Sequence, residues 1–140
     1  MDADEALKHF IAGLVSGEGS FFVSLQRNTA YKTRTQVVCG FSIKVRADDR
    51  ELIDLIGQAL DLAGNVLESG SGTTVTFSVR KQRDLLERII PFFDAYPLRG
   101  RKRENYELWK QVVHQVAAGA HLTPEGLGEI VEIKMRMSRY

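Results

Sequence analysis

The sequence predicts an α+β domain with the element order αββαββα, followed by further helices. Pairs of segments with alternating apolar and polar residues occur twice, and a segment with helical spacing of apolar residues precedes each pair. The 140 residues, 44% of them hydrophobic, suffice for one domain with a core. We expect a single domain over residues 1–140, with the core at about 5–118 and a C-terminal helix at 123–137.

The first unit begins with a helix over residues 4–17, in which apolar residues recur at helical spacing. A strand follows over 20–28, then a loop at 29–33 and a second strand to about residue 44. One face of this hairpin is apolar and the other is largely polar. The apolar face carries Phe21, Val23, Leu25, Val37, Cys39, Phe41 and Ile43.

The second unit begins with a helix for which Asp48 or Asp49 is the N-cap and Gly64 the C-terminal stop. Strands at 66–69 and 73–80 flank a turn at residues 70–72. A third helix is predicted over 84–91, with Phe92, Phe93 and Tyr96 packing in the turn behind it.

Two more helices complete the chain. The first runs from about residue 101 to 118 and presents Tyr106, Trp109 and Val112. The second opens at Thr123-Pro124-Glu125, an N-cap followed by proline at the first helical position. The resulting antiparallel sheet is expected to carry helices on one face and to leave its polar face open.

The charge distribution indicates a nucleic-acid partner, although the net charge is only +1. No acidic residue lies between Glu18 and Asp48, whereas five basic residues do. A second basic cluster spans residues 99–103. Segregated basic surface on a near-neutral chain is typical of DNA-binding proteins.

Cysteine usage and hydropathy indicate an intracellular protein. Cys39 is the single cysteine, which excludes an internal disulfide and fits a reducing compartment; we expect it to be a small buried side chain. The N-terminus lacks the basic region of a secretory signal, and no apolar run reaches the length of a membrane span. These features do not distinguish a bacterial cytoplasm from an organelle.

The segment from Phe10 to Phe21 is the most informative motif. Gly13 and Gly17 lie one turn apart on one helix face, which indicates close approach of another backbone, either within this chain or from a second copy. Glu18 follows between two glycines at the helix end. A carboxylate displayed there suits a hard cation such as Mg²⁺, although in isolation an ordinary helix-end acid is the simpler interpretation.

These residues resemble the LAGLIDADG motif of homing endonucleases. Glu18 occupies the penultimate acidic position, Ser16 the first acidic position, and Gly17 replaces alanine. The resemblance covers roughly residues 5–137, because 41–43, 48–56, 84–96 and a Pro97-Leu98 pair followed by basic residues occur in the family's order. It implies a saddle-shaped αββαββα fold and hydrolysis of both strands of double-stranded DNA.

The resemblance also implies a set of roles. With one motif per chain, a homodimer is expected, packed through Phe10, Gly13, Leu14 and Gly17, with Glu18 and the Gly17 carbonyl as metal ligands. Mg²⁺ is the expected cofactor, and Ca²⁺ is expected to support binding without efficient cleavage. Arg101 or Lys102 takes the place of the family's lysine near the scissile phosphate, and Val45 replaces a polar residue that ends the second strand.

The open face of the sheet is the predicted DNA reader, on a long, pseudo-palindromic site. Arg34, Gln36 and Arg80 are the strongest candidates for bidentate base contacts. The full predicted set is Ser20, Phe22, Ser24, Gln26, Asn28, Tyr31, Arg34, Gln36, Val38, Ser42, Lys44, Glu68, Thr74, Thr76, Ser78 and Arg80.

Two other functions fit parts of the sequence. The same fold could act as an RNA-splicing maturase or a DNA-binding regulator without efficient cleavage. A small-molecule sensor domain would instead require a closed apolar pocket, and the basic run from Arg27 to Arg46 argues against it.

Overall fold

The computed structural model describes residues 1–137 and has the predicted element order. Helix α1 (Ala3–Glu18) leads into strands β1 (Gly19–Arg27) and β2 (Thr35–Arg46). Helix α2 (Arg50–Ala59) and strands β3 (Val66–Glu68) and β4 (Thr74–Val79) form the second unit. Helices α3 (Gln82–Asp84), α4 (Ile90–Ala95), α5 (Arg101–Ala117) and α6 (Pro124–Met137) follow.

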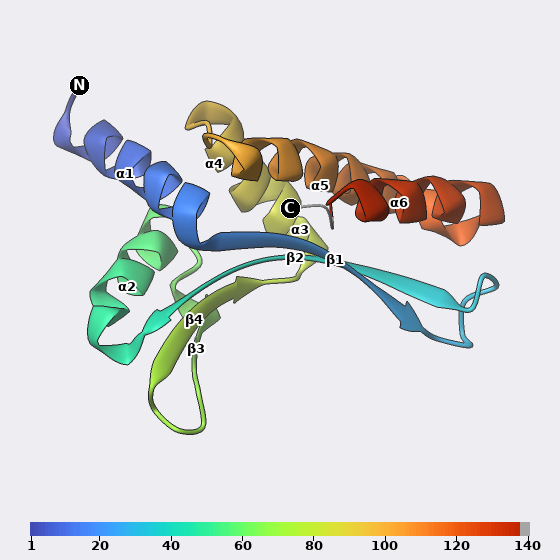
Figure 1. Ribbon diagram of the computed structural model, residues 1–140, viewed down its shortest axis with the longest axis horizontal. Helices are drawn as coiled ribbons and strands as arrows, with labels where there is room; N and C mark the ends of the chain where they lie inside the picture. The colour runs from blue at the N-terminus through green and yellow to red at the C-terminus, as the bar shows by residue number, and fades with distance from the viewer. Residues whose placement is uncertain (138–140) are drawn as a thin grey trace.

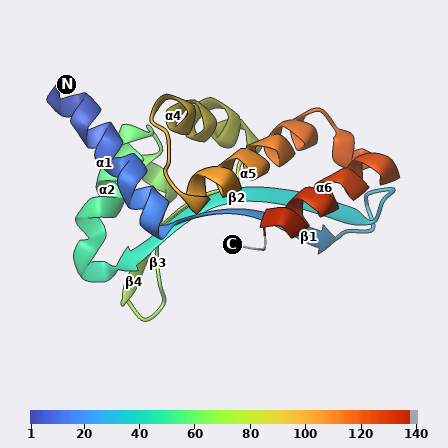
Figure 2. The same ribbon diagram turned by 45° about the horizontal axis from the view of Figure 1, so that its top comes forward.

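The four strands form one antiparallel sheet in the order β1-β2-β4-β3. Figure 1 shows α1, α4, α5 and α6 above the curved sheet, whose lower face carries no helix. Figure 2 shows α5 and α6 running along the β1–β2 ribbon. The predicted α+β saddle with one open sheet face is therefore confirmed.

The core lies between the sheet and the helices, as the alternation of apolar residues along the strands predicted. Phe21 and Phe41 are paired across β1 and β2 and pack against Phe93 and Trp109. Cys39 is buried as predicted, and burial raises the pKa of its thiol to about 12. This thiol is a packing group and not a reactive one.

Helix α2 ends earlier than predicted. Its last residue is Ala59, and Asp61 then takes a left-handed conformation with φ 57°, so Gly64 is not the stop. Gly64 lies in a short 3₁₀ turn, Ala63–Asn65. Asp49 stands at the N-cap, yet its side chain makes no capping hydrogen bond. Arg50 and Asp54 form an ion pair in the first turn instead.

The third helix is longer than predicted. Helical structure runs from Gln82 to Ala95, so Phe92 and Phe93 lie in the helix and not in the turn behind it. The segment Leu85–Ile89 is π-helical, immediately before Pro91. Proline has no N–H and clashes with the carbonyl four residues earlier, and the wider π-helical turn accommodates it.

The C-terminal elements agree with prediction. The Thr123 hydroxyl accepts a hydrogen bond from the Gly126 N–H (3.1 Å), which caps α6. Helix α5 is tied to α4 through Asp94, which accepts from the Tyr106 hydroxyl (2.8 Å) and the Lys110 ammonium (2.9 Å). None of the helices within residues 1–137 has the length and apolarity to span a bilayer.

Candidate active site and nucleic-acid interface

Glu18 is displayed at the end of α1. Its side chain is exposed and forms no hydrogen bond or ion pair with residues 1–137. The turn behind it is fixed by Gly19, whose N–H donates to the Val15 carbonyl. A Cβ on Gly19 would lie 2.6 Å from Val15 Cγ1, so only glycine allows this close approach. The helix end therefore holds Glu18 at a defined place and leaves its carboxylate unpartnered.

The glycine face of α1 is open. Added Cβ atoms on Gly13 and Gly17 would meet nothing within 4 Å, and Phe10 beside them is 50% exposed. Ile11 and Val15, on the opposite side of the helix, are fully buried. The interpretation that these two glycines serve packing within this chain is therefore wrong. The face they share with Phe10 and part of Leu14 is available to a second molecule.

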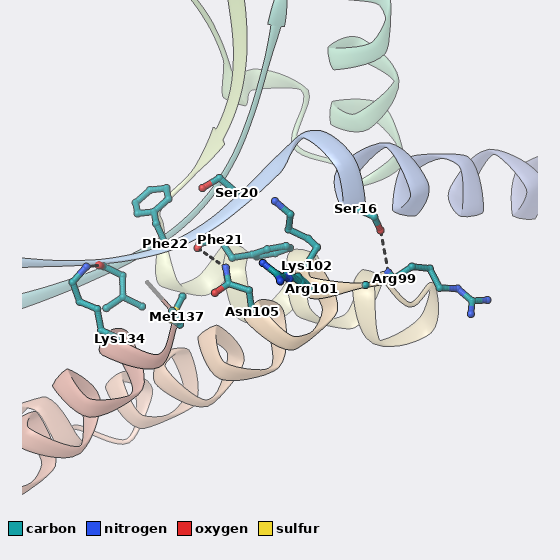
Figure 3. Close-up of a pocket in the computed structure, with 12 residues that line it drawn as sticks. Ser16, Ser20, Phe21, Phe22, Arg99, Arg101, Lys102, Asn105, Lys134 and Met137 are labelled. Carbon is teal, nitrogen blue, oxygen red and sulfur yellow. Dashed lines mark hydrogen bonds between the residues drawn. The ribbon is translucent and has the colours of Figure 1, made fainter. Parts of the chain in front are cut away.

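A cationic pocket lies beside this helix end. It has a volume of about 520 Å³ and opens to solvent between β1, the start of α5 and the end of α6 (Figure 3). Among residues 1–137, the charged side chains that line it are all basic: Arg99, Arg101, Lys102 and Lys134. A cationic, open pocket suits an anionic oxygen and argues against the closed apolar pocket of a sensor domain.

Ser16 connects α1 to the basic cluster. Its hydroxyl donates to the Ala12 carbonyl (2.7 Å) and accepts from the Arg99 N–H (3.1 Å; Figure 3). Gly100 follows with φ 67°, a conformation that favours glycine, and α5 begins at the next residue. Ser16 was missed as a site residue, although its place in the motif singled it out.

Arg101 and Lys102, the two candidates for the cation near the phosphate, both line the pocket but differ in burial and in hydrogen bonding. The Lys102 ammonium donates to the Gly19 carbonyl, one residue beyond Glu18, and is partly buried. Arg101 is exposed and forms no hydrogen bond or ion pair with residues 1–137. Lys102 is thus held next to the Glu18 backbone, whereas the Arg101 guanidinium keeps all its donors available.

Side chains from α5 and α6 hold the edge strand β1 in place. Asn105 donates to the Phe21 carbonyl (3.3 Å), Trp109 to the Phe22 carbonyl (3.1 Å) and Lys134 to the Val23 carbonyl (2.6 Å). These bonds satisfy backbone acceptors at a sheet edge and block pairing with another strand. No sequence pattern signalled these donors, because their partners lie more than 80 residues away.

The open sheet face carries the predicted polar residues. The strand register places Ser20, Ser42 and Ser78 in one row, and Lys44 opposite Thr76 in the next. Gln26 pairs with Gln36, and the Asn28 side-chain amide donates to Oε1 of Gln36 (3.3 Å). Arg34 lies at the hairpin tip with φ 59°. None of the 16 predicted residues is buried.

One sheet prediction needs correction. Glu68 pairs with Val75, a core residue, and forms an ion pair with Arg50, so it lies on the helix side of the sheet. Leu67, 60% exposed, pairs with Thr76 on the open face in its place. Val45 likewise pairs with Val75 and lies on the helix side, so it does not occupy a position on the polar face.

The donors around Glu18 suit a hard divalent cation but do not complete a site in one chain. Carboxylate and carbonyl oxygens are the ligands of Mg²⁺ and Ca²⁺, and the Gly17 carbonyl lies in the last turn of α1, where carbonyls lack partners within the helix. Residues 1–137 contain no group of three acidic, histidine or cysteine side chains that could hold a metal. Within these residues, the donors offered at this place are therefore one carboxylate and the neighbouring backbone carbonyl oxygens.

Comparison with known proteins supports the resemblance to LAGLIDADG endonucleases. Residues 11–113 match the family model described as LAGLIDADG endonuclease. The chain is 37% identical over 123 residues to probable intron-encoded endonuclease 2 of Neurospora crassa and 32% identical over 121 residues to probable intron-encoded DNA endonuclease 1 of Mycosarcoma maydis. These alignments cover 88% and 84% of this chain, but only 27% and 41% of those proteins.

Solved structures are similar over nearly the whole chain. The I-LtrWI LAGLIDADG homing endonuclease bound to target DNA superposes with a TM-score of 0.92 at 35% identity, over 96% of this chain and 45% of that one. I-SmaMI bound to an uncleaved DNA target in the presence of calcium ions gives a TM-score of 0.87 at 31% identity, over 95% and 45% of the two chains. This chain thus spans less than half of each structure.

Proposed function

The chain belongs to the LAGLIDADG endonuclease family, and we propose that it is a homing-type endonuclease that hydrolyses both strands of a specific DNA site. One observation carries this proposal: the exposed Glu18 ends α1 between Ser16 and Ser20, which line the cationic pocket, and it adjoins the open glycine face of the same helix and the start of β1. That arrangement offers a metal ligand, phosphate-binding cations and a base-reading surface together.

We infer that the active form contains two copies, with a C₂ axis between their α1 helices. Gly13 and Gly17 permit close approach, and Phe10 and Leu14 supply apolar area. This arrangement would bring two Glu18 carboxylates close together at the base of the interface. The match to 45% of the solved DNA-bound chain is consistent with one copy forming half of the assembly.

Glu18 and the Gly17 carbonyl would hold Mg²⁺. The bound ion supplies an activated water and stabilises the leaving oxygen in phosphodiester hydrolysis. Lys102 or Arg101, both of which line the pocket, would bind the phosphate flanking the cleaved bond and offset the negative charge that develops on it. Ca²⁺ would support binding without efficient cleavage.

The sheet would read a long, nearly palindromic site through the major groove, which admits a two-stranded β-ribbon. Lys44 and Arg80 form no ion pair with residues 1–137, so both are available to DNA. Arg46, at the end of β2, is instead paired with Asp48 (3.3 Å). The intron-encoded relatives support a gene within an intron and an intracellular site of action.

Glu18→Gln tests the proposal, because it keeps the side-chain size and removes the charge. A cognate duplex is first selected from a randomised library by binding in Ca²⁺. Wild type should cleave this duplex in Mg²⁺, and Glu18→Gln should bind it within a few-fold of wild type without detectable cleavage. Glu129→Gln, an exposed acid on α6, is the matched control and should cleave normally.

The same assay separates the alternative function. A maturase or regulator of this fold would bind in Ca²⁺ and leave the duplex intact in Mg²⁺ with wild-type protein. Cleavage by Glu18→Gln at the wild-type rate would refute the role given to this carboxylate.

A further inference from the structure

Phe22 is an unusual residue on the polar sheet face, and its surroundings give it a specific position. It pairs with Gly40 across β1 and β2, and its ring lies directly over that glycine. A Cβ on Gly40 would come within 2.2 Å of the ring. Gly40 therefore leaves a gap in the face of the sheet that the aromatic ring fills.

The backbone of Phe22 is held from the other side of the sheet. Its carbonyl accepts a hydrogen bond from the indole N–H of Trp109 (3.1 Å), and Trp109 is fully buried in the core. The ring is thus fixed at both ends: its backbone is bound to the core, and its face rests on Gly40. The backbone bond fixes where the side chain starts, and the contact with Gly40 fixes where the ring rests.

Arg80 lies over this ring. It follows Val79, which pairs with Phe41, so the register brings Arg80 beside Gly40. The guanidinium carbon is 5.4 Å from the Phe22 ring centroid, within the range of a cation–π interaction. Arg80 forms no hydrogen bond or ion pair with residues 1–137. The stacked guanidinium therefore keeps its N–H donors available.

We propose that Phe22 positions Arg80 for base recognition, so that Gly40, Phe22 and Arg80 form one specificity unit across three strands. Stacking restricts the orientation of the planar guanidinium and leaves its edge free to donate to O6 and N7 of a guanine. The long arginine side chain then loses less freedom on binding, because the ring already restricts it. Phe22 acts through Arg80 as a positioning residue. This inference rests on the proposed function.

The test compares base-preference profiles of purified full-length variants on a randomised duplex library in Ca²⁺. Arg80→Ala should reduce the preference at one base pair of each half-site by roughly 5- to 150-fold. Phe22→Leu should reduce the preference at that same base pair by a smaller factor. Phe22→Tyr, which keeps an aromatic ring, should retain the wild-type preference. Phe22→Leu combined with Arg80→Ala should lose no more than Arg80→Ala alone. Leu67→Ala, another large apolar residue on this face, is the matched control and should leave this base pair unchanged.

A measurement without DNA checks the geometry separately. The side-chain protons of Arg80 should show upfield NMR shifts from the Phe22 ring, and Phe22→Leu should remove them. Two results would overturn the inference if the wild-type protein does prefer one base at the Arg80 position. One is an unchanged preference at that base pair in Phe22→Leu. The other is a Phe22→Leu variant that loses affinity equally for all sequences. Absence of any sequence preference in wild type would instead overturn the proposed function, and this base-reading role with it.

Discussion

At the scale of single residues, Glu18 and Ser16 show how one short motif prepares a site. Glu18 was identified from sequence because two glycines isolate it at the end of an apolar helix. The structure adds Ser16, which ties α1 to Arg99 across 83 residues of sequence. That contact could not be predicted, since a serine in a helix usually bonds only to its own turn.

Ser16→Ala should loosen the connection before α5. Removing the hydroxyl leaves the Arg99 N–H without its acceptor, which should lower the free energy of unfolding by about 0.5–1.5 kcal/mol. Urea denaturation measures this change. Cleavage should also slow, because the chain that carries Arg101 and Lys102 is less well held. Ser71→Ala, an exposed serine in the turn between β3 and β4, serves as the control.

Lys102 and Arg101 differ in a way that separate substitutions should reveal. Lys102→Met removes a charge and the bond to the Gly19 carbonyl, so it should slow cleavage and also reduce stability. Arg101→Met removes only an exposed charge and should leave stability within about 0.5 kcal/mol of wild type. Single-turnover cleavage rates identify the cation at the phosphate. Equal, wild-type rates for both variants would exclude either residue from that role.

At the scale of secondary structure, periodicity located every helix and strand, and local backbone chemistry set the boundaries. The π-helical turn before Pro91 was not predictable, because it results from accommodating the proline within a helix packed on the sheet. The assignment of Glu68 to the open face failed for a related reason. Strand β3 has only three residues, and its register is visible only in its pairing with β4.

Helix α1 gives a direct test of the two-copy assembly. Gly17→Leu meets nothing within one chain, so the variant should fold with stability equal to or above wild type, because leucine favours helix more than glycine does. Between two closely packed α1 helices the same side chain overpacks the contact and should weaken association by about 1–3 kcal/mol. Sedimentation over a concentration series measures the fractions of monomer and dimer.

Gly128→Leu is the control for this comparison. Gly128 lies in α6, is exposed and also has nothing within 4 Å. This variant should share the gain in helix stability and leave association unchanged. A wild-type chain that sediments as a monomer at micromolar concentration, with and without DNA, would contradict the dimer.

At the scale of the whole molecule, the two faces of the sheet have opposite chemistry. Alternation along β1, β2 and β4 predicted which residues face the helices, and their burial confirms it. Of the basic residues that line the cationic pocket, the sequence singled out the cluster at 99–103 but not Lys134. The closure of this pocket by Lys134 of α6 depends on how the C-terminal helix packs, and a charge pattern does not reveal that.

The buried titratable groups of this core predict a loss of stability at alkaline pH. Burial raises the pKa of the Cys39 thiol from 9.0 to about 12, and burial and the bond to Asp94 raise the pKa of the Tyr106 hydroxyl above its usual 10.0. The folded state therefore keeps protons that the unfolded state releases, so stability is complete below pH 9 and falls as pH rises. Each group contributes a slope of up to about 1.4 kcal/mol per pH unit.

Cys39→Ala separates the thiol from the other contributions. Urea denaturation at intervals between pH 8 and 10.5 should show a shallower decline for this variant than for wild type, because the variant lacks the contribution of the thiol, which begins near pH 9, and keeps that of Tyr106, which begins near pH 10. Truncation of this buried side chain lowers the free energy of unfolding at every pH by a similar amount. The two proteins are therefore compared by how steeply their stability falls with pH. Parallel declines for the two proteins would mean that Cys39 ionises as easily in the folded state as in the unfolded one, which its burial beneath the open sheet does not allow.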